Sequence, residues 1–335
     1  ASLLSKQWQK DKVLIRDKNI SFYLCKESFD DPKILHAQSK KITRYGLIAL
    51  VAVGDHIIPH EKTFQKYVED RAQVTLHTDL QLECVFSMFE NKSVSLKALW
   101  VESDKQRIQF KKDSYELLMN EIHDSQIIHH ICEKLQENKI YIIDGHHRFA
   151  ALNYYHEKKK SKDKYVMMYL TNLCDEGLCV LSTHRAVVWK NNIDASQLLS
   201  NSGLRFETYP WETGLRKIQS SSCLIGLSSK SNPAMIKVFD ASDCALQSPK
   251  HLRLIDKLLQ DNPSQVDYVR GLFDYERSLV QEIQNQKYDS VFWVSPVSWN
   301  EFFDVTDHRT VMPQKSTYFY PKILSGTVIY PLWQE

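Results

Sequence analysis

Several features are scarce in this sequence, and each absence excludes a class of protein. Lys and Arg total 43 against 41 Asp and Glu, a formal net charge of +2, which excludes a nucleic-acid binder that works by bulk positive charge. No apolar run approaches the roughly 18 residues of a membrane helix, so we expect no membrane partner. Glycine occurs only 9 times in 335 residues, so any glycine inside a polar motif is of interest.

The cysteines give no sign of a disulfide framework. All seven are scattered, and none is spaced as a CxxC pair, which favours reduced, buried thiols. The N-terminal residues show no charged segment followed by an apolar core and a small-residue cleavage site, as a secretory signal would. We therefore expect a cytoplasmic protein, and the sequence leaves its oligomeric state open.

The length of the chain exceeds one typical domain of roughly 100–200 residues. Strand-like and helix-like signals alternate in the first half and are less regular after residue 190. We therefore expect an α+β protein with a mixed domain over residues 1–190 and a second α/β domain over residues 191–335. Hydrophobic spacing and cap residues predict helices over residues 63–82 (capped by Thr63), 125–138 (capped by Asp124), 252–260 and 266–286, and a hairpin over residues 223–239.

The strongest local signal is the run Asp144-Gly145-His146-His147-Arg148, which follows an apolar strand over residues 140–143. Such a strand-to-helix turn points backbone N–H groups at whatever lies above it. Gly145 allows close approach of a ligand, and Arg148 offers a planar fork for phosphate oxygens. His146 and His147 are further phosphate-binding candidates, and Asp144 is a candidate ligand of Mg²⁺. The alternative is a capped helix with structural histidines.

A second polar segment follows Pro59, after another buried strand. Glu61 is a candidate general base toward an alcohol, with His60, Lys62 and Arg71 in support. The second histidine of a zinc-protease HExxH motif is missing. The alternative is a surface loop that ends in a helix cap at Thr63.

A third segment, residues 182–185, follows an apolar run and contains two candidate phosphate ligands, His184 and Arg185. The alternative is a loop that enters a strand.

A fourth segment, residues 313–322, combines basic and hydroxyl side chains with three aromatic ones. Its candidate ligands of an anion are Lys315, Ser316, Thr317 and Lys322. It is not a P-loop, because the preceding glycines are absent and no helix follows. Since the segment has no acidic partner of its own, we expect it to fold back onto the turn at Asp144. The alternative is an extended segment that packs its aromatic side chains on the core.

Other motifs are absent. The sequence has no GxSxG elbow, no GxGxxG loop and no spacing of ligands for structural zinc. These absences argue against a serine hydrolase, a dinucleotide-binding fold and a zinc module.

Five motifs, in order, resemble the family called domain of unknown function 1015. They are PHEKT at residues 59–63, EDR at 69–71, YIIDGHHRFAAL at 141–152, GLCVLSTHR at 177–185 and MPQKSTYFYPK at 312–322. The resemblance covers residues 20–335. A PPYDV-like segment typical of members is not found here, so what that segment contributes stays open.

Two of these motifs are also similar to those of the ParB/sulfiredoxin-type superfamily, in particular the free serine kinases. That resemblance implies a ParB/sulfiredoxin-like first domain. It implies that Glu61 is the base toward the substrate hydroxyl and that Asp144 lies near the metal or that hydroxyl. It also implies phosphate binding by His146, His147 and Arg148.

The resulting hypothesis is a kinase that uses ATP or ADP and Mg²⁺ to phosphorylate the hydroxyl of a small, serine-like metabolite. One alternative is a nucleotide-binding switch without turnover, which needs no base at Glu61. Another is a metal-dependent phosphodiesterase, which needs more carboxylates than Asp144 and Glu61 supply. The expected partners are a nucleotide and a small molecule, and no nucleic acid.

Overall fold

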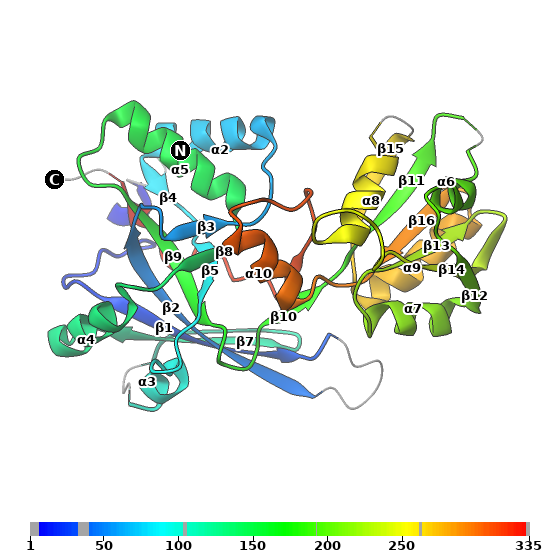
Figure 1. Cartoon of the computed structure of the whole chain (residues 1–335). Coiled ribbons are helices and arrows are strands. Elements are labelled where there is room, and N and C mark those ends of the chain that lie inside the picture. Colours follow the sequence, from blue (N-terminus) through cyan, green and yellow to red (C-terminus); the bar gives the residue numbers. More distant parts are fainter. Residues whose placement is uncertain (1–6, 33–39, 103–105, 192, 261–262, 333–335) are drawn as a thin grey trace.

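The computed structural model describes residues 7–32, 40–102, 106–191, 193–260 and 263–332. Its architecture is mixed α+β with several sheets, as the sequence predicts. Figure 1 shows two groups of strands and helices, one from each half of the chain, with α10 between them.

The first half is built on an eight-stranded sheet in the order β3-β8-β5-β9-β2-β1-β7-β6. Most of its neighbours are antiparallel, but β3 pairs in parallel with β8 and β5 pairs in parallel with β9. The strands are β1 (Phe22–Asp30), β2 (Lys41–Ala52), β3 (Ile57–Pro59), β5 (Val85–Phe89), β6 (Gln106–Lys112), β7 (Tyr115–Ile122), β8 (Ile140–Asp144) and β9 (Tyr165–Asn172).

Four helices accompany this sheet: α2 (Gln65–Thr78), α3 (Leu96–Glu102), α4 (Ser125–Leu135) and α5 (His146–Lys159). Figure 1 shows α2 and α5 side by side at the top of this half and α3 and α4 at its bottom. The predicted cap of α4 is confirmed, because the Asp124 carboxylate accepts from the N–H groups of Gln126 and Ile127. In the described ranges, no helix is both long and apolar enough to span a membrane.

Helix α2 is shorter than predicted. It begins after Phe64, which has no side-chain cap, so the predicted cap at Thr63 is wrong. The Phe64 N–H is instead bound by a histidine ring from another element. The helix ends because Asp79 takes a left-handed conformation (φ 51°), which a continuing helix does not allow.

The second half is built on a six-stranded sheet in the order β12-β14-β13-β16-β11-β15. Its strands are β11 (Thr183–Trp189), β12 (Phe206–Pro210), β13 (Leu224–Ser229), β14 (Asn232–Asp240), β15 (Pro263–Arg270) and β16 (Ser290–Val294), and its helices are α6 (Ala195–Asn201), α7 (Trp211–Gln219), α8 (Lys250–Leu258) and α9 (Phe273–Gln284). The predicted hairpin is confirmed as β13 and β14.

The predicted helix over residues 266–286 is wrong in its first part. Residues up to Arg270 form β15, an edge strand paired with β11. Only after Gly271 does the chain begin α9, at Phe273. The backbone hydrogen bonds to β11 decide this segment, since an edge strand needs no continuous apolar face.

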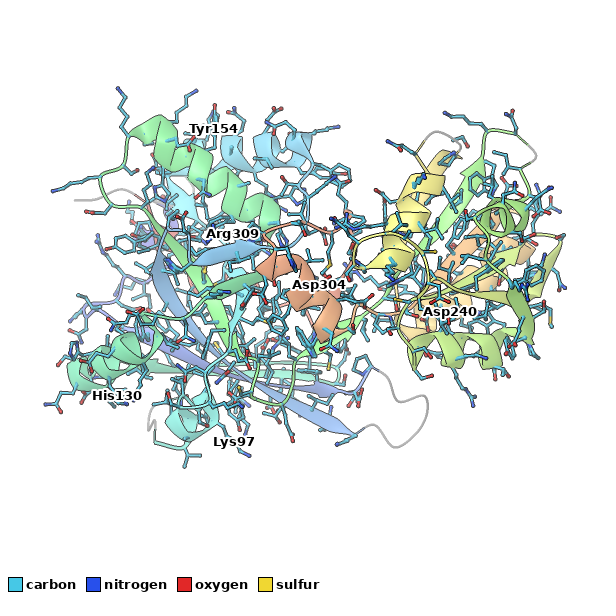
Figure 2. All side chains as sticks on the ribbon, viewed as in Figure 1. Lys97, His130, Tyr154, Asp240, Asp304 and Arg309 are labelled. Carbon is cyan, nitrogen blue, oxygen red and sulfur yellow. The ribbon has the colours of Figure 1, made fainter. Side chains whose placement is uncertain are left out.

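The end of the chain returns to the first half. Helix α10 (Trp299–Asp307) leads into β17 (Tyr318–Tyr320), which pairs with β10 (Cys179–Leu181), and then into β18 (Tyr330–Pro331), which pairs with β4 (Leu80–Gln81). Figure 2 labels Asp304 and Arg309, on and just after α10, between the two halves.

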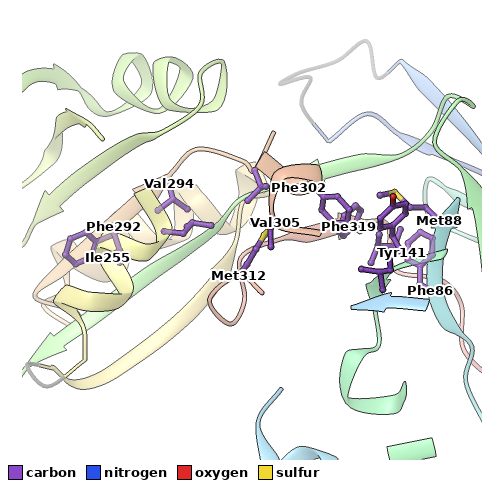
Figure 3. Close-up of a cluster of buried hydrophobic side chains, with 14 of the residues drawn as sticks. Phe86, Met88, Tyr141, Ile255, Phe292, Val294, Phe302, Val305, Met312 and Phe319 are labelled. Atoms are coloured by element: carbon purple, nitrogen blue, oxygen red, sulfur yellow. The ribbon is translucent and has the colours of Figure 1, made fainter. Parts of the chain in front are cut away.

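A single apolar cluster runs through this junction. Figure 3 shows Phe292 and Ile255 at one end, Phe302 and Met312 in the middle, and Tyr141 at the other end. The side chains of Phe302 and Met312 are at most 2% exposed. Burial of large apolar side chains stabilises by about 1.5–3 kcal/mol each, so α10 and the segment after it hold the halves together.

A buried ion pair fixes the C-terminal segment to the first sheet. Arg44 Nε donates to Glu27 Oε2 at 2.7 Å, and neither side chain is more than 1% exposed. The hydroxyls of Tyr115 and Tyr169 also donate to Glu27. Arg44 Nη2 donates to the carbonyl of Pro321 at 3.0 Å, so the pair also fixes the position of the segment after β17.

Candidate active site

The candidate site begins where β8 turns into α5. Four buried apolar residues lead to Asp144, the last residue of β8. Gly145 takes a left-handed conformation (φ 95°), and α5 begins at His146. A Cβ at Gly145 would lie 3.1 Å from Nε of Arg148. The glycine therefore allows both the sharp turn and the close approach of the Arg148 side chain.

Asp144 lies between two cations. Arg148 Nη2 donates to its Oδ2 at 2.9 Å, and Lys322 Nζ donates to its Oδ1. Burial raises the pKa of Asp144, but Lys322 and Arg148 together outweigh this and the net shift is downward. Arg148 also donates to the carbonyl of Cys84 and lies 3.4 Å from Glu83. Asp144 is thus an ionised carboxylate, and the Arg148 fork is occupied by protein groups.

Strand β3 brings the second motif to the same edge, because its parallel pairing with β8 places both carboxyl ends together. His60 follows β3 and is fully buried. Its Nδ1 lies 2.7 Å from the carbonyl of Ile142, and its Nε2 lies 3.0 Å from Oγ1 of Thr317. Since a carbonyl only accepts, Nδ1 carries the proton and Nε2 accepts from Thr317. Burial lowers the pKa of His60 to about 4, so the ring is neutral.

The two histidines of the turn bind backbone N–H groups of the second motif. The His60 N–H donates to Nε2 of His146 at 3.3 Å, and the Phe64 N–H donates to Nε2 of His147 at 2.9 Å. A nitrogen that accepts carries no proton, and burial lowers the pKa of both rings. In this structure His146 and His147 therefore position residues 60–64.

Glu61 lies where the C-terminal segment meets the second motif. It forms a parallel bridge with Met312, and the Lys315 N–H donates to its Oε1 at 2.8 Å. Burial raises the pKa of Glu61, and the Lys315 N–H offsets this only in part. A carboxyl group with a raised pKa, held in place by one N–H donor, has the properties of a general base.

The C-terminal segment returns to the Asp144 turn, as the sequence predicts. Lys315 contacts Glu61, Thr317 contacts His60 and Lys322 contacts Asp144. Lys315 has φ 57°, a conformation that costs a non-glycine residue about 1–2 kcal/mol. Ser316 does not join the site, because it is buried and its hydroxyl donates to the carbonyl of Pro313 at 2.6 Å.

The two candidates on β11 have separate surroundings. His184 is fully buried, and its Nε2 lies 2.8 Å from Oε1 of Glu276. Its Nδ1 accepts from the Val294 N–H, so the structure does not bring His184 to the other candidates. Arg185 Nη2 donates to the carbonyl of Lys315 at 3.3 Å, which places Arg185 beside the C-terminal segment.

A cavity of about 320 Å³ lies beside Arg185, between the second motif and α8. It is lined by Lys62, Arg185, Arg253, Asp256, Lys257, Leu259, Gln260, Val266, Tyr268 and Pro313. The sequence did not lead us to predict Arg253 and Lys257 on α8 as site residues. Its only signal was their spacing of four, which puts both on one face of a helix. Arg71 is exposed on α2 and does not line this cavity.

A second cavity, of about 700 Å³, includes Lys322 in its lining. The other lining residues come from the turn between β6 and β7 and from residues 320–325. Lys322 therefore connects Asp144 to an open space next to the site.

The family of this chain is identified by comparing its whole sequence with the patterns of known families. The pattern described as Protein of unknown function (DUF1015) matches residues 1–266. The chain belongs to this family. Comparison with curated proteins gives no match.

Solved structures with similar folds include three that cover most of this DUF1015 chain. One is a mutant free serine kinase in complex with AMP, with 14% identity, a TM-score of 0.46, and coverage of 81% of this chain and 87% of the other. A conserved hypothetical protein from Pyrococcus furiosus has 15% identity, a TM-score of 0.46, and coverage of 85% and 95%. SbnI with C-terminal truncation from Staphylococcus aureus has 12% identity, a TM-score of 0.48, and coverage of 85% and 87%.

Proposed function

We propose that this DUF1015 protein is a nucleotide-dependent kinase that phosphorylates the hydroxyl group of a small, serine-like metabolite. The observation that carries the proposal is Glu61, a carboxyl group with a raised pKa within electrostatic reach of Asp144 and Lys322. Phosphoryl transfer needs an oriented acceptor hydroxyl and neutralised phosphate charge more than unusual side chains. The resemblance of both motifs at this edge to those of free serine kinases supports the same reading.

In this proposal Glu61 accepts the proton of the acceptor hydroxyl as its oxygen attacks the terminal phosphorus of ATP or ADP. The leaving nucleotide keeps the electron pair of the broken P–O bond. Lys315 and Lys322 neutralise charge on the phosphates, together with Arg148 and the N–H groups that follow Gly145.

A magnesium ion suits the donor set, because Asp144 is ionised and Mg²⁺ prefers carboxylate oxygen together with phosphates. Asp144 would hold the ion, whose chemistry is to neutralise phosphate charge. His146 and His147 position the segment that carries Glu61, through the backbone N–H groups that they bind.

The acceptor is proposed to enter from the cavity beside Arg185. Lys62, the residue after Glu61, lines this cavity with three further cations and one carboxylate. An acceptor that carries an anionic group besides its hydroxyl fits this lining best. The proposal also includes a ParB/sulfiredoxin-like first domain, a second α/β domain, and a cytoplasmic location.

One observation favours a second candidate, a nucleotide-binding switch without turnover. The side chains of His146, His147 and Arg148 are all occupied by other groups of the protein. A ligand that displaced Arg148 from Glu83 or Asp144 would change how the turn is held, which is a switch-like response.

The experiment measures thermal unfolding with ATP, ADP, CTP and GTP, each with Mg²⁺, with and without free amino acids. A nucleotide that binds the folded chain raises the midpoint by mass action. That nucleotide is then tested for transfer of its labelled terminal phosphate to serine and related hydroxy acids. A shift with transfer supports the kinase, and a shift without transfer to any acceptor supports the switch. No shift with any nucleotide would refute both.

A further inference from the structure

Three side chains distant in the sequence meet at one end of the second sheet. Cys223 precedes β13, His251 lies in the first turn of α8 and Glu301 lies in the first turn of α10. One possible ligand atom from each lies within 4.8 Å of the others. Cys223 Sγ is 3.4 Å and His251 Nδ1 is 3.7 Å from Oε1 of Glu301. Their positions in the sequence follow no metal-binding spacing, so no motif reveals the cluster.

His251 Nδ1 is a buried polar atom without a hydrogen-bond partner. The ring is fully buried, and its Nε2 lies 3.2 Å from the carbonyl of Ser295. Because that carbonyl only accepts, Nε2 carries the ring proton and Nδ1 presents a lone pair. In the neutral ring, this lone pair faces the Glu301 carboxylate. Two facing lone pairs repel, and a buried acceptor without a partner is costly. A cation between the two atoms removes both penalties.

Neighbouring groups form hydrogen bonds with the atoms of Glu301 and His251 that would not face the ion, as is usual for metal ligands. Oε2 of Glu301 accepts from the N–H and the hydroxyl of Ser298, at 2.9 and 2.8 Å, which leaves Oε1 for the cluster. The outer N–H of His251 donates to a backbone carbonyl, the usual arrangement for a ligating histidine. Cys223 has φ 61°, which is uncommon for a residue with a side chain.

We propose that Cys223, His251 and Glu301 bind a divalent transition-metal ion. Zn²⁺ fits best, because its ligands include thiolate, imidazole and carboxylate in tetrahedral arrangement. On binding, the Cys223 thiol releases its proton to solvent, so thiolate and carboxylate together balance the charge of the ion. Three protein ligands leave the fourth position for water.

The position of this site gives the ion a structural role that is independent of the proposed kinase. The ion would join α8 and the start of β13 to α10. In α10, Glu301 is followed by Phe302, whose ring centroid lies 4.8 Å from that of His60. The metal therefore fixes the helix that lies between the two halves.

The test uses the full chain, made metal-free with a chelator under reducing conditions and titrated with Zn²⁺ or Co²⁺. We expect about one ion per chain by elemental analysis, a thiolate-to-cobalt charge-transfer band, and a higher unfolding midpoint with Zn²⁺. Cys223→Ser loses the cobalt–thiolate band and most of the bound zinc. The matched control is Cys244→Ser, which changes the other half-buried cysteine and keeps both. Glu301→Gln retains the thiolate band but binds the ion more weakly.

Two results would overturn the proposal. One is a wild-type chain that takes up neither ion, a measurement that depends on no variant. The other is an unchanged cobalt–thiolate band in Cys223→Ser, which places the ion on other cysteines.

Discussion

The edge formed by β3 and β8 and the cavity beside α8 both collect charged side chains, but only the edge pairs them with opposite charge. At the edge, Asp144 lies between Lys322 and Arg148, and the histidines bind backbone N–H groups. In the cavity, four cations accompany one carboxylate, Asp256. Within the described residues, none of these cations forms an ion pair, and Arg185 and Arg253 donate only to backbone carbonyls.

The difference indicates a division of labour. A network whose members all have partners is set in place before a ligand arrives. A cation that forms no ion pair keeps its charge for an incoming anion. We infer that the edge supplies the framework, the base and the groups that face the phosphates, and that the cavity binds the anionic group of the acceptor. The four predictions below test this division, from the largest effect to the smallest.

Removing the base should have the largest effect on turnover. Glu61→Gln keeps the shape and one acceptor oxygen for the Lys315 N–H but cannot take a proton, so kcat should fall by roughly 10²–10⁴-fold. Nucleotide affinity and the unfolding midpoint should change little. The control is Glu69→Gln, an exposed carboxylate on α2 that pairs with Gln65. Wild-type turnover in Glu61→Gln would place the base elsewhere.

Breaking the buried ion pair should have the largest effect on stability. Arg44→Met leaves the Glu27 carboxylate buried without its cation, which should lower the free energy of unfolding by about 3–5 kcal/mol. Lys41→Met, on the same strand, breaks an exposed pair with Asp30 and should cost at most about 1 kcal/mol. Denaturant unfolding measures both. Equal losses in the two variants would contradict a framework role for the buried pair.

Low pH should lower the free energy of unfolding through His60, which lies at the edge formed by β3 and β8. Its pKa is lowered to about 4 in the folded chain and is about 6.5 when unfolded. The unfolded state therefore binds more protons between these values, and stability falls as pH drops from about 6.5 to 4. The contribution of this one ring is roughly 3 kcal/mol.

The measurement is the free energy of unfolding against pH for wild type and His60→Asn, which keeps a donor but cannot ionise. The variant should show a shallower slope in that window. His129→Asn, at an exposed histidine on α4, should keep the wild-type slope. Parallel curves for wild type and His60→Asn would mean that the pKa of His60 does not change on folding.

Removing one cation from the cavity should have the smallest effect. Lys257 is exposed, so Lys257→Gln should lower the affinity for inorganic phosphate by about three- to tenfold, with a dependence on salt. In a turnover assay the KM of an anionic acceptor should rise while kcat stays the same. Lys250→Gln, on the same helix but outside the cavity lining, is the control. A loss of kcat without a change in KM would assign Lys257 to the chemistry.

The sequence correctly predicted those parts of the fold that depend on residues close to one another in the chain. The apolar run before Asp144, the Asp124 cap and the hairpin of β13 and β14 each depend on neighbours in the sequence. The segment that became β15 was misread because its pairing with β11 is decided by residues far away in the chain. No local signal marked Glu27 and Arg44, because a buried charge is tolerated only where the fold supplies its partner.

The same limit applies to the candidate site. The sequence singled out Glu61, Asp144 and the C-terminal segment, whose residue types are unusual where they stand. The sequence also suggested His184 as a site residue, on the same grounds as its neighbour Arg185. Alternate residues of a strand face opposite sides, and only the folded sheet decides which of the two meets Lys315.

The contact between Glu61 and Lys315 also has a consequence for the synthesis of the protein. The two residues are 254 positions apart, so the carboxylate leaves the ribosome long before its N–H donor does. Loop closure over such a distance is slow, and a chain that stops before residue 315 carries both β3 and β8 but not the residues that cover them. A prematurely ended chain would therefore present an open, unfinished edge, which cellular quality control can recognise.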